Sequence, residues 1–455
     1  MSATNPTVPL NETRDSLGKA PPLQKQTTVG NYFISNYPPF AYWQQERVGE
    51  LQSALDRPPA PGVDLGLYLH IPFCRKRCHF CYYKVYTDKD SQEIRNYLDA
   101  ALQELAVYAR KPFIGSRRPR FIYFGGGTPS YLSVEQLKSL TDGMKSLLPW
   151  DGAEEITFEA EPGTLTDHKL KAIRELGITR LSLGIEHFDD HILEINGRAH
   201  RSKEIVRAYS FAREIGFPQV NIDLIAGMVE ETEEKWRETV ARAVALHPDS
   251  VTIYQMEIPY NTTIYQQMKA EGRLVAPVAD WDIKRAWVDY AFKEFEKSGY
   301  TVTSATTVVR DPAVVKFLYR EGLFSGADIL SVGVASFGHL NGVHYQNHHD
   351  FAPYVERVQR GELPVFRALT PSADERYIRE FMLQLKLGRV SRRRFAEKFG
   401  VDPLTRFAAP LQRLKDWGYL TVEGDCISIK RDGLLQIDRL LHEFFLPEHE
   451  GPRYV

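Results

Sequence analysis

Short β-rich segments alternate with longer helical ones from Gly66 to about residue 256, and this alternation limits the folds open to the chain. The stretches between the segments repeat apolar residues every three or four positions, as amphipathic helices do. Alternation of this kind predicts a parallel sheet with helices packed outside it. Six units indicate an α/β fold, a partial (β/α)6 barrel. The six segments are 66–71, 120–124, 155–160, 180–185, 219–225 and 249–256.

After about residue 370 the pattern changes. Three helical segments at 374–387, 391–399 and 404–417 precede a hairpin at 418–430, and a last helix is predicted over 431–445. Three helices and a hairpin indicate a winged-helix-like α+β domain. Such domains often bind DNA, but acidic residues dilute the basic run near residue 392, and the whole chain has a net charge of -2. We therefore expect a structural or substrate-covering role and no nucleic-acid partner.

The chain divides into four predicted parts. Residues 1–30 are rich in Ser, Thr, Pro and Asn and are expected to form a flexible arm. Residues 31–65 are dense in aromatic side chains and form either a strap over the core or a lid over the active site. Residues 66–365 make the barrel and its extension, and residues 366–455 make the C-terminal domain.

The composition of the chain indicates where the protein is located and which classes of protein it does not belong to. No run approaches the roughly 18 apolar residues of a membrane-spanning helix. The N-terminal segment lacks the apolar core of a secretory signal. We expect a cytoplasmic, monomeric protein without a membrane partner.

Three of the four cysteines, Cys74, Cys78 and Cys81, lie within eight positions directly after the first predicted strand, and Cys426 stands alone. In a reducing compartment such a cluster is typical of metal binding or catalysis. Thiolates bind zinc or iron–sulfur clusters. His79 and His70 could complete a zinc site. Alternatively, three cysteines would hold a [4Fe–4S] cluster and leave one iron open to a small chelating molecule.

The Cys-x3-Cys-x2-Cys motif after the first strand of a (β/α)6 pattern resembles the radical S-adenosylmethionine (SAM) superfamily. Within it, the chain is similar to the family of oxygen-independent coproporphyrinogen III oxidase over about residues 66–340, and residues 374–445 resemble that family's C-terminal domain. The similar stretches are 68-YLHIPFC-74, 124-FGGGTPS-130, 159-EAEPGT-164, 180-RLSLGIEHF-188, 221-NIDLIAGM-228 and 332-VGVASFGH-339.

The resemblance implies the cofactors. The three cysteines would ligate three irons of a [4Fe–4S] cluster, and the amino and carboxylate groups of one SAM would chelate the fourth. An electron from a donor such as flavodoxin or ferredoxin would cleave SAM to methionine and a 5′-deoxyadenosyl radical. The cofactors would carry the chemistry, and the protein would supply placement and a dry pocket.

The resemblance also implies a set of SAM-binding positions. Three consecutive glycines, residues 125–127, would lie at the carboxyl end of the second strand, where their backbone can approach a ligand closely. Glu159 would end the third strand and contact SAM. The residues carried over to the SAM site are Tyr68, Phe80, Gly126, Gly127, Thr128, Glu159, Gln255 and Phe337.

A further group resembles the residues around a second SAM in that family. It consists of Glu186, His187, Arg198 and Asp223, and we expect these four to be catalytic. The family normally has Gln where this chain has Glu186, so a negative charge is added that would pair with a sulfonium or with Arg198. His191 and His200 are expected to be solvated helix residues.

Three activities compete. Cys81-Tyr82-Tyr83 replaces the Cys-x-Cys that typically continues in the oxidase, which disfavours porphyrinogen decarboxylation. A haem chaperone typically lacks the arm of about 65 residues that precedes the first strand here. We therefore expect a methyltransferase or cyclopropanase that uses two SAM molecules, one as the carbon donor, and acts on an sp2 carbon of a small aromatic or conjugated substrate.

Overall fold

The computed structural model describes residues 25–27, 33–273 and 275–451. Within them the main feature is a sheet of twelve strands in the order β12-β11-β10-β9-β1-β2-β3-β4-β5-β6-β8-β7. Strands β1 to β6 pair in parallel, each with the next along the chain. The predicted partial (β/α)6 barrel is confirmed. Its strands are β1 (Leu65–Ile71), β2 (Phe121–Gly126), β3 (Glu155–Ala160), β4 (Arg180–Glu186), β5 (Gln219–Ala226) and β6 (Ser250–Gln255).

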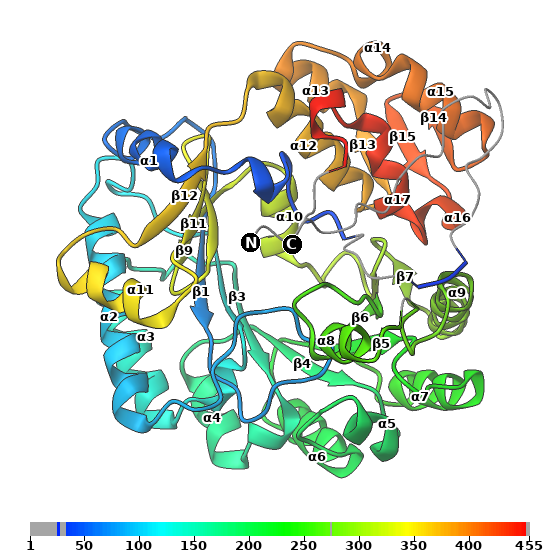
Figure 1. The fold of residues 1–455 in the computed structure, drawn as a ribbon, viewed down its shortest axis with the longest axis horizontal. Coiled ribbons are helices and arrows are strands. Elements are labelled where there is room, and N and C mark those ends of the chain that lie inside the picture. Colours follow the sequence, from blue (N-terminus) through cyan, green and yellow to red (C-terminus); the bar gives the residue numbers. More distant parts are fainter. Residues whose placement is uncertain (1–24, 28–32, 274, 452–455) are drawn as a thin grey trace.

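Helices follow these strands and cover the outer face of the curved sheet (Figure 1). Helix α2 begins at Asp90, whose carboxylate accepts the N–H groups of Gln92 and Glu93, and α3 begins in the same way at Ser133. These caps satisfy N–H groups that a helix start leaves unpaired. The outer helices are α2 (Ser91–Ala109), α3 (Val134–Leu147), α4 (Asp167–Glu175), α5 (Asp190–Ile195), α6 (Ser202–Glu214), α7 (Glu233–Ala245) and α9 (Trp281–Lys297).

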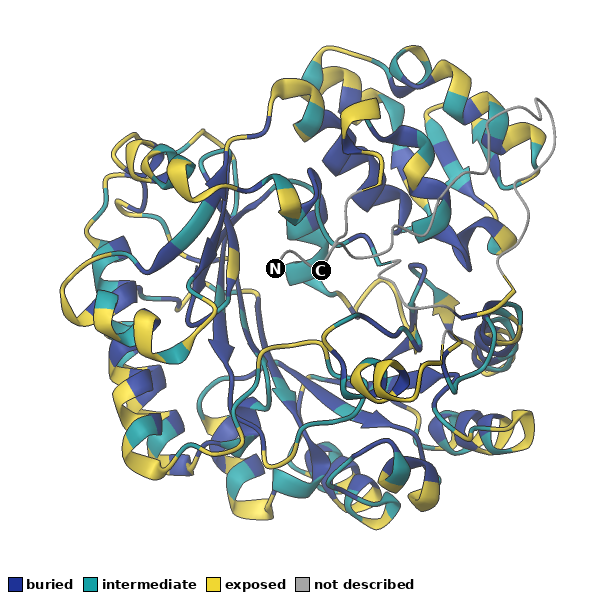
Figure 2. Ribbon diagram, viewed as in Figure 1, coloured by how far each residue is buried: buried dark blue, intermediate teal, exposed yellow. Residues whose placement is uncertain are grey.

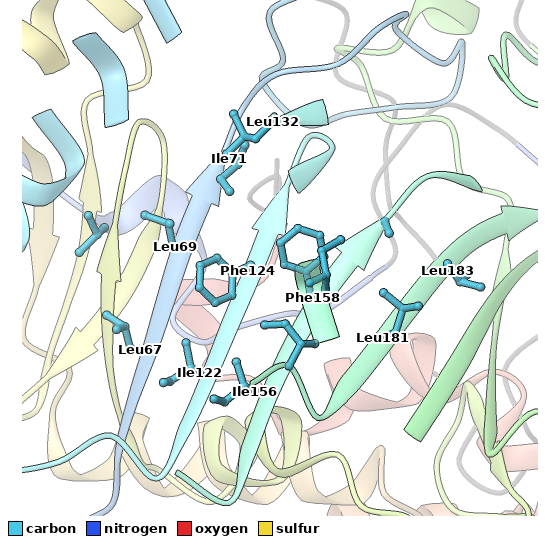
Figure 3. Close-up of a cluster of buried hydrophobic side chains, with 14 of the residues drawn as sticks. Leu67, Leu69, Ile71, Ile122, Phe124, Leu132, Ile156, Phe158, Leu181 and Leu183 are labelled. Carbon is cyan, nitrogen blue, oxygen red and sulfur yellow. The ribbon is translucent and has the colours of Figure 1, made fainter. Parts of the chain in front are cut away.

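The apolar core lies between the sheet and these helices (Figure 2). In β1, Leu67, Leu69 and Ile71 are fully or almost fully buried in the same cluster as residues of α2 and α3 (Figure 3). Because side chains alternate along a strand, Tyr68 and His70 point to the opposite face, toward the barrel interior. The interior therefore receives the polar side chains of these strands.

The sheet continues beyond the parallel strands at both edges. Strand β9 pairs in parallel with β1, and antiparallel strands extend the sheet from β9 and from β6. The domain boundary predicted at 365/366 falls inside β12. These edge elements are β7 (Thr301–Val302), β8 (Thr307–Val309), β9 (Asp328–Val332), β10 (Phe337–Leu340), β11 (Val343–Asn347) and β12 (Val365–Leu369), with helices α8 (Thr263–Ala270), α10 (Leu318–Phe324) and α11 (Phe351–Gln359).

A buried polar network holds the β1 end of the barrel. Glu104 of α2 is fully buried and accepts hydrogen bonds from the Tyr354 hydroxyl (2.6 Å), the Gly333 N–H (2.9 Å) and the Asn347 amide (2.7 Å). Tyr97, two turns earlier on the same face of α2, donates to the carbonyl of His70 at 2.7 Å. Because His70 precedes the cysteines by four positions, this network fixes the end of β1 from which the cysteine loop departs.

The C-terminal domain has its own core. Two predicted helices are broken, because Phe407 and Gln436 leave helical geometry, and the Phe407 ring packs against Phe381 and Phe444. A third strand, β13, adds to the predicted hairpin. The elements are α12 (Ala373–Leu385), β13 (Arg389–Ser391), α13 (Arg392–Phe399), α14 (Pro403–Arg406), α15 (Ala408–Asp416), β14 (Leu420–Glu423), β15 (Cys426–Ile429), α16 (Arg431–Leu434) and α17 (Ile437–Leu441).

The aromatic segment that precedes the barrel joins the two domains, and we name residues 33–44 the strap. At one end the Ile34 N–H donates to Asp438 (2.7 Å), and Lys386 donates to both the Ile34 carbonyl (2.9 Å) and Asp438 (2.7 Å). At the other end Gln44 pairs with Ala368 of β12. The short helices that follow are 3-10 turns at Phe40–Tyr42 and Gln45–Arg47 and helix α1 (Val48–Leu55).

Most of the predicted arm, residues 1–24 and 28–30, lies outside the described residues. In the part of the chain that the structure describes, no helix is both long and apolar enough to cross a bilayer.

We expect Glu104→Gln to remove a pH dependence of stability. Burial raises the pKa of Glu104 to about 7 from its ordinary 4.5. Between pH 4.5 and pH 7 the folded chain keeps a proton on Glu104 that the unfolded chain releases. The contribution of Glu104 to the free energy of unfolding is therefore largest below pH 4.5, and it falls by about 3 kcal/mol as the pH rises through 7. Urea unfolding at pH 5 and pH 8 measures this difference. The exposed Glu234→Gln variant serves as control, and equal pH dependence in both variants would contradict the prediction.

Candidate active site

A cavity of 390 Å³ opens at the carboxyl ends of the parallel strands. Its walls come from the cysteine loop, the strand ends of the barrel, helix α9, the C-terminal domain and Phe33 of the strap. Residues that line it include Phe33, Phe80, Cys81, Tyr82, Tyr83, Gly127, Thr128, Glu159, Glu161, Ser182, Glu186, Arg198, Asp223, Tyr254, Gln255, Trp281, Arg285 and 434–439. A cavity of this size and position is typical of a small-molecule site in α/β proteins.

The cysteine loop is fixed at both ends. The Cys74 N–H donates to the carbonyl of Tyr86 (3.0 Å), and the Tyr86 N–H donates to that of Pro72 (2.8 Å). Arg77 donates to the Cys81 carbonyl at 3.1 Å. All three loop cysteines are free thiols.

The glycine-rich turn after β2 lies directly against this loop. The Gly127 N–H donates to the carbonyl of Ile71 (2.8 Å), and the Thr128 N–H donates to the carbonyl of Phe73 (2.9 Å). The Thr128 hydroxyl lies 3.3 Å from the Cys74 sulfur. A Cβ at position 127 would lie 2.9 Å from the backbone of Pro72 and 3.0 Å from that sulfur. Only glycine therefore permits this approach, as expected of a turn that cradles a cofactor.

The donor set fits an iron–sulfur cluster better than zinc. His79 and His70 bond to the Ile195 carbonyl and the Tyr68 hydroxyl through Nδ1, which leaves Nε2 as the ring nitrogen that a metal would need to reach. Among the described residues, no three His, Cys, Asp or Glu side chains converge on one metal ion. In a cluster each cysteine binds a different iron, so its sulfurs need not converge. Burial raises the pKa of Cys74 to about 11, so the charge of bound iron would be needed to keep a thiolate here.

Two half-buried carboxylates line the same cavity as the cysteine loop. Glu159, near the end of β3, accepts hydrogen bonds from the Tyr123 hydroxyl (2.5 Å) and the Gly126 N–H (3.1 Å). Burial raises its pKa to about 7. Asp223 of β5 accepts from Ser182 (3.1 Å) and Asn221 (3.0 Å), and burial raises its pKa as well. These hydrogen bonds fix the oxygen atoms that a cationic or hydroxyl-bearing ligand would meet.

A third carboxylate, Glu186, faces Arg198. The Glu186 oxygen lies 3.6 Å from one Arg198 nitrogen, and a second nitrogen of Arg198 donates to the Cys78 sulfur at 3.2 Å. The sequence therefore brings a carboxylate, a guanidinium and a cysteine into one row at the cavity wall.

The structure gathers most of the predicted SAM residues at the cavity. Phe80, Gly127, Thr128, Glu159, Glu186, Arg198, Asp223 and Gln255 line it. Three others do not. Tyr68 stacks on Tyr123 inside the barrel, Gly126 contributes its N–H to Glu159, and Phe337 packs on Phe40 and Trp43 of the strap.

His187 is not placed for catalysis. Glu186 has a positive φ of 63°, and the chain turns so that His187 is fully buried on the other side of the strand end. There its Nε2 lies 3.0 Å from Glu231 and 3.1 Å from the Thr239 hydroxyl of α7. His200 is also fully buried, and its Nδ1 lies 2.8 Å from Glu161, so of the three neighbouring histidines only His191 is solvated.

Several lining residues were missed by sequence reasoning. Tyr82, Tyr83 and Tyr254 line the cavity and keep 37%, 47% and 41% of their surface exposed. The first two follow Cys81 directly, which was the available signal. Residues 434–439 and Phe33 carried no such signal, because tertiary packing alone brings them to the barrel.

Comparisons with known proteins agree with this geometry. Residues 68–243 match the radical SAM superfamily model, and residues 372–435 match the HemN C-terminal domain model. The chain is 29% identical to the heme chaperone HemW of Bacillus subtilis (strain 168), over 81% of this chain and 96% of that protein. It is 27% identical to the oxygen-independent coproporphyrinogen III oxidase of Escherichia coli (strain K12), over 78% of each.

The solved structure of coproporphyrinogen III oxidase (HemN) from Escherichia coli, described as a radical SAM enzyme, has the same fold. It superposes with a TM-score of 0.77 and 24% identity, over 92% of this chain and 99% of that one.

The expectation of carbon methylation or cyclopropanation is wrong. The curated relatives above are an oxidase and a haem chaperone, and the structure that covers nearly the whole chain is the oxidase. The comparisons support a [4Fe–4S] cluster and SAM through the radical SAM match, but not a second SAM as carbon donor.

We expect Gly127→Ala to lose cluster binding, because the added methyl group would occupy the space between Pro72 and the Cys74 sulfur. Iron and sulfide content after anaerobic reconstitution measures the loss. Gly152→Ala is the matched control, since a Cβ there meets nothing within 4 Å. Cys78→Ala should lose the cluster and Cys426→Ala should retain it. Normal iron content in Gly127→Ala would contradict this account of the turn.

Proposed function

Because the chain belongs to the radical SAM superfamily, we propose that it oxidises a porphyrinogen-type tetrapyrrole by removing the carboxyl group of a propionate side chain. When bound, the cluster and SAM supply a 5′-deoxyadenosyl radical that takes one hydrogen atom from that side chain. The side chain then releases CO2, passes one electron to an external one-electron acceptor, and becomes a vinyl group. Flavodoxin or ferredoxin is the proposed electron donor.

The position of the C-terminal domain carries this proposal. Residues 434–439 form the cavity wall that faces the barrel, and the Gln255 side chain donates to the Leu435 carbonyl at 2.9 Å. The barrel and the C-terminal domain therefore form the cavity together. Leu434 and Leu435 of this wall fall within residues 372–435, which match the HemN C-terminal domain model, and this favours a substrate related to that of the oxidase.

The charges of this part of the cavity suit a substrate with carboxylate groups. Arg285 and Arg439 both line it. Burial, and then the charge of Arg439, lowers the pKa of Arg285. Asp282 lies 3.4 Å from Arg285, and Asp438 lines the same wall, so a substrate carboxylate would meet these guanidinium groups beside acidic residues.

The residues near the cysteines suit SAM and a reactive intermediate. We propose that Gly127, Thr128 and Glu159 hold one SAM molecule, with the Glu159 carboxylate oriented by Tyr123 and Gly126. The rings of Tyr82, Tyr83 and Tyr254 would exclude water from the substrate side, which protects a radical from side reactions.

We expect the reconstituted protein to convert coproporphyrinogen III to a vinyl-bearing product in the presence of SAM and a reductant. Mass spectrometry of the oxidised porphyrins and of 5′-deoxyadenosine measures the reaction, and each decarboxylation should be accompanied by deoxyadenosine. Cys78→Ala should abolish both products. Deoxyadenosine without any porphyrin product would reject this substrate class.

Haem binding is a second candidate, because the similarity to the heme chaperone extends over 96% of that protein. A chaperone should bind haem in a stable complex and transfer it to an apoprotein. We expect this activity only if the vinyl product is not formed. Anaerobic titration with haem, followed by its absorption spectrum, measures it, and the absence of saturable binding would remove this candidate.

A further inference from the structure

We propose that Glu186 and Arg198 set the reduction potential of the cluster at Cys74, Cys78 and Cys81, as a charge pair that acts on the Cys78 sulfur. This inference rests on the cluster that the radical SAM match implies. It does not depend on the substrate.

The backbone of β4 is shaped to present Glu186. The register between β4 and β5 shifts between Gly184 and Glu186, and Glu186 itself has a φ of 63°. A residue other than glycine in this region costs about 1–3 kcal/mol and persists where the surroundings impose it. The irregularity places a charged side chain at the cavity wall instead of in the strand.

Gly184 provides the space in which the pair meets. A Cβ at position 184 would lie 3.0 Å from the Glu186 carboxylate and 3.5 Å from an Arg198 nitrogen. The Gly184 carbonyl accepts a hydrogen bond from Arg198 at 2.5 Å. The guanidinium is therefore held on one side by the backbone and on the other by the Cys78 sulfur, at 3.2 Å.

The carboxylate of Glu186 has one close partner among the described residues. None of them donates a hydrogen bond to it, and its nearest cation is Arg198 at 3.6 Å, with both side chains 11% exposed. The two other carboxylates nearby have further partners of their own. Glu161 faces His200 and Arg75, and Asp223 is bound by Ser182 and Asn221. The charge of Glu186 therefore acts mainly on Arg198.

These contacts have opposite effects on the cluster. One-electron reduction adds negative charge, and a guanidinium that donates to a ligand sulfur stabilises that charge, so Arg198 raises the potential. A carboxylate beside the guanidinium offsets it, so Glu186 lowers the potential. Both side chains are buried, and in such surroundings charges at this distance interact more strongly than in water. Glu186 acts through Arg198 and need not touch the substrate.

The test is a redox titration of the reconstituted full-length protein with dithionite, without SAM or substrate, in which the reduced cluster is measured by electron paramagnetic resonance. Burial raises the pKa of Glu186 to about 7, so the titration is run at pH 8.5, where the carboxylate is ionised. Glu186→Gln keeps the size of the side chain and removes this charge, so the midpoint potential should shift to a more positive value. Arg198→Met removes the donor and the charge, so the potential should shift to a more negative value.

Glu155→Gln is the matched control, because Glu155 is a buried carboxylate at the opposite end of β3. Its potential should equal that of the unmodified protein. Unchanged potentials in both test variants, shifts of the same sign, or an equal shift in the control would overturn the proposal. If Arg198→Met fails to assemble a cluster, the sign of the shift in Glu186→Gln alone decides. Because no substrate is present, failure here is distinct from failure of porphyrinogen oxidation.

Discussion

The parallel pairing of β1 to β6 is the constraint on which the site depends. It brings the ends of six strands, and the loops that follow them, to one edge of the sheet. Cysteines after β1, glycines after β2 and carboxylates on β3, β4 and β5 are distant in sequence but adjacent in space. A strand that ran in the opposite direction would carry its own group to the other edge of the sheet.

This edge concentrates groups that are costly to bury. Glu159, Glu186 and Asp223 all have raised pKa values because of burial, and Arg198 is the cation beside them. Ionisable groups with shifted pKa values that gather in one cavity are typical of a functional site.

The strand–helix alternation was sufficient to predict the barrel, and the helix and hairpin pattern after residue 370 predicted the C-terminal domain, because both depend on local sequence. The residues at the cavity were predicted only through the resemblance to the oxidase family. His187 was misplaced, because the positive φ of Glu186 and the register shift turn the chain over at that point, and no local pattern signals this. Phe337 was misplaced because the strap, which covers it, comes from a distant segment. The predicted reaction type was wrong because two residues after the cysteines, Tyr82 and Tyr83, do not determine the reaction of a chain whose relatives along most of its length are an oxidase and a haem chaperone.

The strap also has a consequence for the order of events during synthesis. Its residue Ile34 bonds with Lys386 and Asp438, which lie 352 and 404 positions later in the chain. Phe33 can take its place in the cavity only after nearly the whole polypeptide has left the ribosome. Until then the loop with the three cysteines lies beside an incomplete wall.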